Sequence, residues 1–251
     1  MIQKSGGEGM QRGVSQWLRR LAGWGDIIFA AECPLCQRST AQELCQDCWT
    51  QVERCRWTHP VRETESPSIF AWGHYRGALK QTIAALKYDQ HRQLARPLGR
   101  WLAQSWLTQT QHPRNLMVVP IPLHISKQKE RGFNQAELVG RPFCEFTRLP
   151  LEPQGLIRSR ATEAQFHLSP EAREQNLSAA FELGTLRDRT QRAVLLLDDI
   201  YTTGATTRAA IQVLQRSNIP VYGIVAVARA GDPGKNFPPS SPFPVKPPAY
   251  K

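Results

Sequence analysis

The chain has 251 residues, with 32 Lys and Arg against 21 Asp and Glu, and a formal net charge of +11. Hydrophobic residues make up 41% of it and charged residues 21%, which is typical of a globular protein and excludes a collagen-like, coiled-coil or wholly disordered chain. The longest aliphatic block covers only residues 194–197, whereas a membrane span needs about 20 apolar residues. Most of the excess positive charge lies in residues 61–160, which favours an anionic partner, either a phosphorylated small molecule or nucleic acid; a solvated basic surface is the alternative.

The first residues are Gly-rich, and the helical spacing of apolar residues predicts a short amphipathic helix over residues 14–22. Arg19 and Arg20 precede a partly apolar stretch, as a targeting segment would require. Asp26 interrupts that stretch, however, and Glu32 stands where a cleavage site needs a small residue. We therefore expect a cytoplasmic protein with reduced thiols.

Four of the six cysteines form two CxxC pairs, CPLC and CQDC, separated by eight residues: Cys33, Cys36, Cys45 and Cys48. Two such pairs can bring four thiolates to one tetrahedral Zn²⁺ ion, so the spacing predicts a structural zinc site. Four free cysteines in a small core and a redox-active pair are the alternatives. Cys55 and Cys144 have no partner at such a spacing, and we expect both to be small buried side chains.

After a polar linker at residues 61–68, strand and helix patterns alternate. Apolar runs predict strands at 69–75, 117–121, 193–197 and 221–228, and helical spacing predicts helices at 78–88, 94–107, 136–146 and 205–216. Residues 158–176 are polar and irregular, and the Pro-rich residues 231–251 are expected to be a disordered tail. Aliphatic strands that alternate with helices are typical of a parallel sheet covered on both faces.

One turn carries the strongest chemical signal. Residues 194–207 read VLLLDDIYTTGATT: a buried strand, then Asp198 and Asp199, then a Thr/Gly loop that opens onto a helix. Ligands of open α/β sheets bind at the carboxyl ends of the strands, and backbone N–H groups at a helix N-terminus favour a phosphate. Paired carboxylates beside such a cradle suit the vicinal hydroxyls of a sugar or a magnesium ion. A capped strand–helix turn with two solvated aspartates is the alternative.

This turn resembles the phosphoribosyl-pyrophosphate (PRPP) loop of type I phosphoribosyltransferases. CPLC…CQDCW, ALKY (85–88), VVPIPLH (118–124) and RGFNQA (131–136) precede it, in an order similar to that of the ComF/GntX family of competence-associated phosphoribosyltransferase-like proteins. The resemblance runs over about residues 26–230. It implies an α/β type I phosphoribosyltransferase fold over residues 69–230 and a four-cysteine zinc ribbon over residues 26–60, while the N-terminal segment 1–25 and the tail 231–251 lie outside it.

The resemblance implies roles for the matching residues. The paired acids, Asp198 and Asp199, would hold the ribose hydroxyls and assist catalysis. The loop after VVPIPLH would contact the diphosphate, and residues 158–176 would form a mobile loop that closes over the ligand. The resemblance further implies a 5′-phosphate site at Thr202, Thr203, Gly204, Ala205, Thr206 and Thr207. It implies diphosphate contacts from Lys127, Lys129 and Arg131, and mobile-loop contacts from Arg160, Gln165 and Arg173. Solvated loop charge and an ordinary surface loop are the alternatives for the last two groups.

The partners implied by the family are PRPP with Mg²⁺ and, in DNA uptake, single-stranded DNA and a helicase-like ATPase. No set of residues specifies an acceptor base. Three functions therefore remain open: a PRPP-binding protein of natural competence, an active phosphoribosyltransferase, and a zinc-ribbon scaffold with an inactive transferase fold. Aromatic residues such as Trp72 and Tyr75 could stack on bases, but Trp101 and Trp106 lie on a helix with core-like neighbours, which favours packing.

Overall fold

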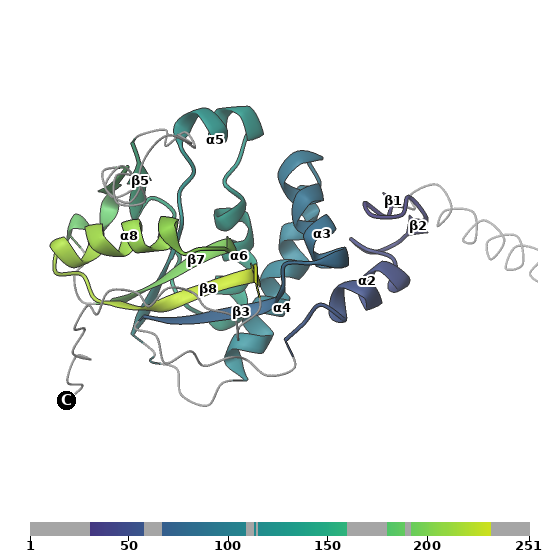
Figure 1. Cartoon of the computed structure of the whole chain (residues 1–251), viewed down its shortest axis with the longest axis horizontal. Helices are drawn as coiled ribbons and strands as arrows, with labels where there is room; N and C mark the ends of the chain where they lie inside the picture. Colours follow the sequence, from purple (N-terminus) through teal and green to yellow (C-terminus); the bar gives the residue numbers. More distant parts are fainter. Residues whose placement is uncertain are drawn as a thin grey trace, which may run out of the picture.

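The computed structural model describes residues 31–57, 67–108, 113, 115–159, 180–188 and 192–231. Its centre is a four-stranded parallel sheet in the order β3-β8-β7-β4 (Figure 1). The strands are β3 (Ser68–His74), β4 (Leu116–Pro120), β7 (Ala193–Tyr201) and β8 (Val221–Arg229). Each covers a predicted apolar run, and the expected parallel α/β architecture is confirmed. Among the described residues, no helix has the length and apolarity needed to cross a membrane.

Helices cover both faces of this sheet. Alternate residues of β7 belong to two separate apolar cores, Leu195 and Leu197 to one and Val194 and Leu196 to the other, because successive strand side chains point to opposite faces. The first core is closed by α3 (Gly77–Tyr88), α4 (Ala95–Leu107) and α6 (Gln135–Thr147), and the second by α8 (Ala205–Arg216). A short 3₁₀ turn, η1 (Arg92–Leu94), leads into α4. The four helices predicted after residue 68 are therefore present, whereas the helix predicted over residues 14–22 lies outside the described residues.

The close crossing of α4 and α6 explains two residues that are unusual inside helices. A Cβ atom at Gly99 would lie 2.4 Å from the carbonyl oxygen of Val139 and 2.5 Å from Cγ of Pro142. Pro142 lies inside α6 and does not end it. Glycine on α4 thus makes room for the backbone and the proline of α6.

Several elements after β4 were not predicted. Residues 125–131, expected as a loop, form the short helix α5 (Ile125–Arg131), which His124 caps by accepting the N–H of Ser126. A two-stranded antiparallel sheet pairs β5 (Leu156–Arg158) with β6 (Phe181–Leu183), which is followed by the 3₁₀ turn η2 (Thr185–Asp188). The side chains of Leu156 and Phe181 extend the core beneath α8.

The cysteine segment contains the short strands β1 (Ala31–Glu32) and β2 (Ser39–Thr40) and the helix α2 (Gln46–Glu53). Figure 1 shows α2 beside α3 and β3. The segment docks there through aromatic contacts with α4 and backbone contacts with β3. The Trp49 and Trp101 rings stack with centroids 4.0 Å apart, and the N–H of His74 donates to the carbonyl oxygen of Cys55 at 2.8 Å. A Cβ atom at Gly73 would lie 2.7 Å from that same oxygen, so this contact needs glycine. The proposed linker and the boundaries of the domains stay predictions, because residues 58–66 lie outside the described residues.

Candidate functional site

The two predicted acids occupy different environments at the carboxyl end of β7. Asp199 is buried, with 3% of its surface exposed, whereas Asp198 is half-buried. The alternation of the strand explains the difference, since adjacent side chains point to opposite faces of the sheet. One hydrogen bond links the pair: the N–H of Asp199 donates to Oδ1 of Asp198 at 2.8 Å.

Asp199 is held by side chains from two helices. Its carboxylate forms an ion pair with Lys87 at the end of α3, and its Oδ1 accepts the Nε2–H of Gln135 at 3.0 Å. Lys87 and Asp199 are both mostly buried, with 14% and 4% of their side chains exposed. Gln135 in turn accepts a hydrogen bond from the guanidinium of Arg131. Asp199 therefore joins α3, α6 and β7 at this edge of the sheet.

Of the two acids, Asp198 is the one whose ionised form is disfavoured. Burial and the neighbouring charge of Asp199 raise its pKa well above the ordinary value, against the opposing effects of the Asp199 N–H group and Lys87. Arg158, at the end of β5, lies within electrostatic reach of this carboxylate. Burial lowers the pKa of Arg158, and the charge of Asp198 opposes that effect. A ligand that brings hydrogen-bond donors or a cation to Asp198 would stabilise its ionised form.

The Thr/Gly loop forms the predicted helix N-terminus. Gly204 has a φ of +74°, and a Cβ atom there would lie 2.3 Å from the Tyr201 hydroxyl, so the turn needs glycine. The first N–H of α8 that bonds back into the helix is that of Arg208, to Gly204. Two threonine hydroxyls are engaged within the loop: Thr203 accepts the N–H of Ala205 at 3.4 Å, and Thr207 donates to the carbonyl oxygen of Gly204 at 2.9 Å. Thr202 and Thr203 are exposed, and Thr206 is half-exposed.

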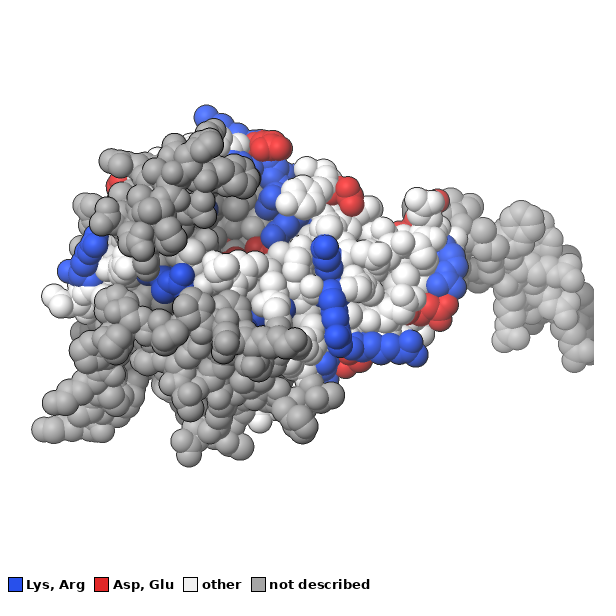
Figure 2. Space-filling model, in the orientation of Figure 1, with Lys and Arg blue, Asp and Glu red and all other residues white. Residues whose placement is uncertain are grey.

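The predicted diphosphate residues lie on α5. Lys127 and Lys129 are exposed, and Arg131 lies at the last position of the helix, with its guanidinium 5.4 Å from the Tyr88 ring. The structure thus corrects the expected loop to a helix and links Arg131 to Asp199 through Gln135. Figure 2 shows Lys and Arg side chains that continue from α5 down toward the carboxyl edge of the sheet. The predicted mobile-loop residues Arg160, Gln165 and Arg173 lie outside the described residues.

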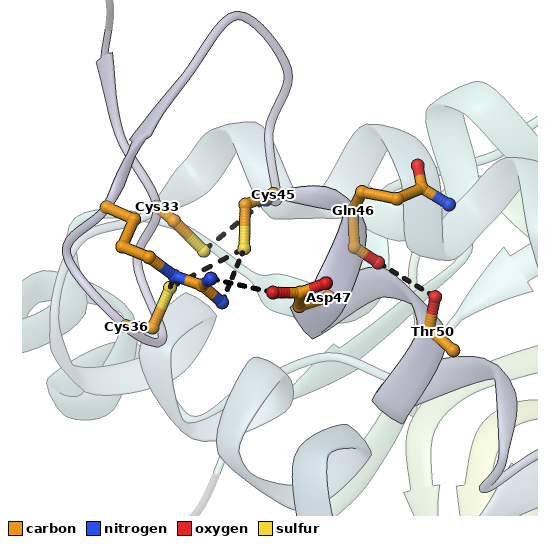
Figure 3. Close-up of polar contacts among 7 residues, drawn as sticks. Cys33, Cys36, Cys45, Gln46, Asp47 and Thr50 are labelled. Carbon is orange, nitrogen blue, oxygen red and sulfur yellow. Dashed lines mark hydrogen bonds and ion pairs between the residues drawn. The ribbon is translucent and has the colours of Figure 1, made fainter.

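The four predicted metal ligands come together. The Sγ atoms of Cys33, Cys36, Cys45 and Cys48 all lie within 4.8 Å of one another, and Figure 3 shows three of these side chains pointing inward. A tetrahedral Zn²⁺ with Zn–S bonds of about 2.3 Å separates its sulfurs by roughly 3.8 Å, so the cluster fits a metal ion such as zinc. Arg38 lowers the pKa of the Cys36 thiol to about 6, which favours the thiolate that a metal needs.

The remaining cysteines pack as expected, as do Trp101 and Trp106, whereas Trp72 was considered for stacking on bases. Cys55 and Cys144 are buried, and Trp106 meets the Phe143 ring edge-on at 5.8 Å between centroids. Trp72 is also buried, and its ring lies 5.6 Å from that of Trp101. These aromatic rings are therefore engaged in the core and in the docking of the cysteine segment.

Sequence reasoning missed the role of Lys87. A weak signal exists: Lys87 lies one helical turn after Ile83, on the side of α3 that also carries the fully buried Leu79. A lysine on a buried face predicts a buried anionic partner, although no sequence pattern identifies Asp199 as that partner. Arg229, at the end of β8, was also missed; it is buried, and its guanidinium lies 5.5 Å from the Tyr201 ring.

Sequence comparison finds relatives over most of the chain, although no family model matches it. Competence protein F of Haemophilus influenzae is 31% identical over 163 residues, which cover 63% of this chain and 71% of that protein. DNA utilization protein YhgH of Salmonella typhi is 28% identical over 229 residues, 85% of this chain and 96% of that protein. Competence protein ComFC of Bacillus subtilis is 27% identical over 184 residues, 72% of this chain and 70% of that protein.

Structural comparison finds phosphoribosyltransferases. An adenine phosphoribosyltransferase from Thermoanaerobacter pseudethanolicus matches with a TM-score of 0.33 and 13% identity, over 58% of this chain and 83% of that one. The Trypanosoma brucei enzyme, solved with AMP, pyrophosphate and ribose-5-phosphate, matches with a TM-score of 0.36 and 11% identity, over 75% of this chain and 85% of that one.

Proposed function

Because the chain belongs to the ComF family, we propose that it binds PRPP together with Mg²⁺ at the turn between β7 and α8 and acts in DNA uptake in the cytoplasm. The observation that carries the proposal is the junction itself. The half-buried carboxylate of Asp198 lies a few residues before a glycine with positive φ, which opens a helix N-terminus. Such a junction offers an acceptor for sugar hydroxyls beside a site that attracts a phosphate.

Each part of PRPP has a counterpart in this arrangement. The 5′-phosphate would lie against the first N–H groups of α8 and the exposed hydroxyls of the Thr/Gly loop. Asp198 would accept hydrogen bonds from the ribose hydroxyls or hold the magnesium ion that accompanies PRPP, and either contact would favour its ionised form against the burial and the Asp199 charge that raise its pKa. The basic residues of α5 would lie toward the diphosphate, with Arg131 as the residue already linked to the acids.

Calorimetric titration with PRPP, with and without MgCl₂, tests this proposal. We expect saturable binding to the unmutated protein and weaker binding without the metal. Asp198→Asn should weaken it by about 10- to 100-fold, because hydrogen bonds to a charged group contribute about 1.5–3 kcal/mol. Thr206→Val should weaken it less, and Thr50→Val on α2, a threonine far from the loop, should leave it unchanged. An unmutated protein that shows no binding at millimolar PRPP and Mg²⁺ would refute the proposal and favour an inactive scaffold.

The DNA-uptake part of the proposal rests on the family, whose members include a DNA utilization protein and a competence protein. Since Trp72 and Trp106 are buried, contact with single-stranded DNA would depend on basic side chains more than on these rings. We expect binding of single-stranded DNA whose log K falls steeply with log salt and varies little with sequence. An affinity for single-stranded DNA no better than that for a neutral polymer at moderate salt would contradict a direct role in DNA handling. A pull-down with a helicase-like ATPase of the uptake machinery would test the proposed protein partner.

An active phosphoribosyltransferase is the second candidate. The observation that favours it is the chain of contacts from Arg131 through Gln135 to Asp199, which connects the expected diphosphate end of the site to its acids. Binding alone would need no such connection, whereas catalysis stabilises a departing diphosphate and a developing ribose charge together. Release of pyrophosphate from PRPP in the presence of one member of a panel of bases would support this function, and its absence across the panel would exclude it.

A further inference from the structure

The cysteine cluster has an arginine that contacts two of its sulfurs at once. Arg38 lies on the turn between the two CxxC pairs, and its Nε–H donates to Sγ of Cys36 at 3.3 Å. Its Nη2–H donates to Sγ of Cys45 at 3.7 Å. One guanidinium therefore bridges a ligand from each CxxC pair.

The bridged sulfurs are the accessible ones. Cys33 and Cys48 are buried, whereas Cys36 and Cys45 are only half-buried. The Sγ of Cys33 accepts the N–H of Cys45 at 3.4 Å, so its hydrogen bond comes from the backbone. Arg38 thus lies over the side of the cluster that solvent and competing ligands would reach first.

Charge gives this placement a consequence for a bound metal. Four thiolates around one Zn²⁺ ion leave about two negative charges on the site. A guanidinium against two of the sulfurs offsets part of that charge without entering the coordination sphere. Outer hydrogen-bond partners of this kind typically change metal affinity by about 10- to 100-fold when they are removed.

A second residue holds the arginine in place. The Nη1–H of Arg38 donates to Oδ2 of Asp47 at 2.6 Å, and Asp47 lies in the first turn of α2, between Cys45 and Cys48. Both side chains are more than half exposed, and ion pairs at such positions contribute little to folding stability. The ion pair therefore serves mainly to orient the planar guanidinium toward the sulfurs, and a lysine has no planar group to orient in this way.

We propose that Arg38, oriented by Asp47, is an outer-sphere partner of the metal bound by the four cysteines and slows its release. Arg38 acts on the ligands and is not itself a ligand, so it is a positioning residue. The proposal does not depend on PRPP binding or on any activity of the β7–α8 turn.

Zinc release from the full-length, zinc-loaded protein tests this inference. The protein is mixed with excess chromophoric chelator, and the release rate is measured at neutral pH. We expect Arg38→Ala to release zinc about 10- to 100-fold faster than the unmutated protein. Arg38→Lys and Asp47→Asn should show intermediate rates, since each keeps part of the interaction. Arg56→Ala is the matched control, because Arg56 forms a comparable exposed ion pair with Glu53 beside the same helix, and its rate should be unchanged.

Two further readouts separate this role from a general effect on folding. The ratio of release rates between Arg38→Ala and the unmutated protein should shrink as salt rises, since the attraction is partly exposed and therefore screened. The charge-transfer bands of the Co²⁺-substituted protein should shift in Arg38→Ala and stay in place in Arg56→Ala. Equal release rates for Arg38→Ala and Arg56→Ala would overturn the proposal. If Arg38→Ala does not fold, the proposal is overturned when Arg38→Lys releases zinc at the same rate as the unmutated protein. It is also overturned if the unmutated protein binds no zinc.

Discussion

Replacing Lys87 by methionine should destabilise the ligand-free protein by about 3 kcal/mol. The substitution keeps the length and the apolar stem of the side chain but removes the cation that faces Asp199. Breaking a buried ion pair by removing one partner costs about 3–5 kcal/mol, because the other charge stays buried and unpaired. We take the lower end because 14% of the Lys87 side chain is exposed and because Gln135 still donates to Asp199.

The reverse substitution should cost less. In Asp199→Asn the charge left behind is that of Lys87, whose long side chain can move its ammonium group toward solvent. In the double variant no charge stays buried, so its loss of stability should be smaller than the sum of the two single losses. The coupling energy of the cycle should be at least about 1 kcal/mol, in the range found for residues in direct contact.

Thermal and urea unfolding of the zinc-loaded, ligand-free protein measure these effects. For a chain of this size, about 3 kcal/mol corresponds to a fall in Tm of roughly 6–12 °C. Lys80→Met is the control, since Lys80 lies on the same helix at an exposed position, and it should change stability by less than about 0.5 kcal/mol. Two results would refute the reasoning that Lys87 stabilises the buried carboxylate of Asp199. One is a Lys87→Met variant as stable as Lys80→Met, and the other is a double variant whose loss of stability equals the sum of the two single losses.

Three further outcomes follow from the site and the core. The pKa of Asp198 is raised, so the folded protein holds this proton more tightly than the unfolded chain and loses stability as pH rises from about 4 through the raised pKa. In urea unfolding, Asp198→Asn should therefore be as stable as the unmutated protein near pH 4 and more stable than it at pH 7. A variant that is less stable at both pH values would contradict this. Gly204→Ala should lower stability by about 1–2 kcal/mol, because alanine is strained at a φ of +74°, and should weaken PRPP binding; an unchanged Tm and affinity would show that the turn tolerates a side chain. Burial raises the pKa of the Cys144 thiol to about 12, so this residue should resist alkylation at pH 8 in the folded protein and react in urea, as mass spectrometry of the labelled peptide can show; rapid labelling in the folded state would disagree.

The elements of the sheet were predictable because each has a local signature. Residues 194–197 are aliphatic without interruption, which indicates a strand buried on both faces, and the same holds for much of β8. The four cysteines were predictable as a cluster because two CxxC pairs can converge only around a small volume. Helix α5 was not predictable in this way, since its seven residues are all exposed or half-exposed and have no apolar face.

The chain order of residues 194–207 determined the chemistry of the candidate site: two acids after a buried strand, then a glycine where the backbone must turn and a helix must begin. It left the two acids equivalent, because adjacent carboxylates look alike in a sequence. Only the tertiary structure separated them, since Lys87 and Gln135 reach Asp199 from helices that lie about 112 and 64 positions away along the chain. Contacts over such separations depend on how helices cross a sheet, and no local pattern of residues encodes that crossing. The same reason explains Arg38, whose position between the cysteines was evident, but whose contact with sulfurs of both pairs required the folded turn.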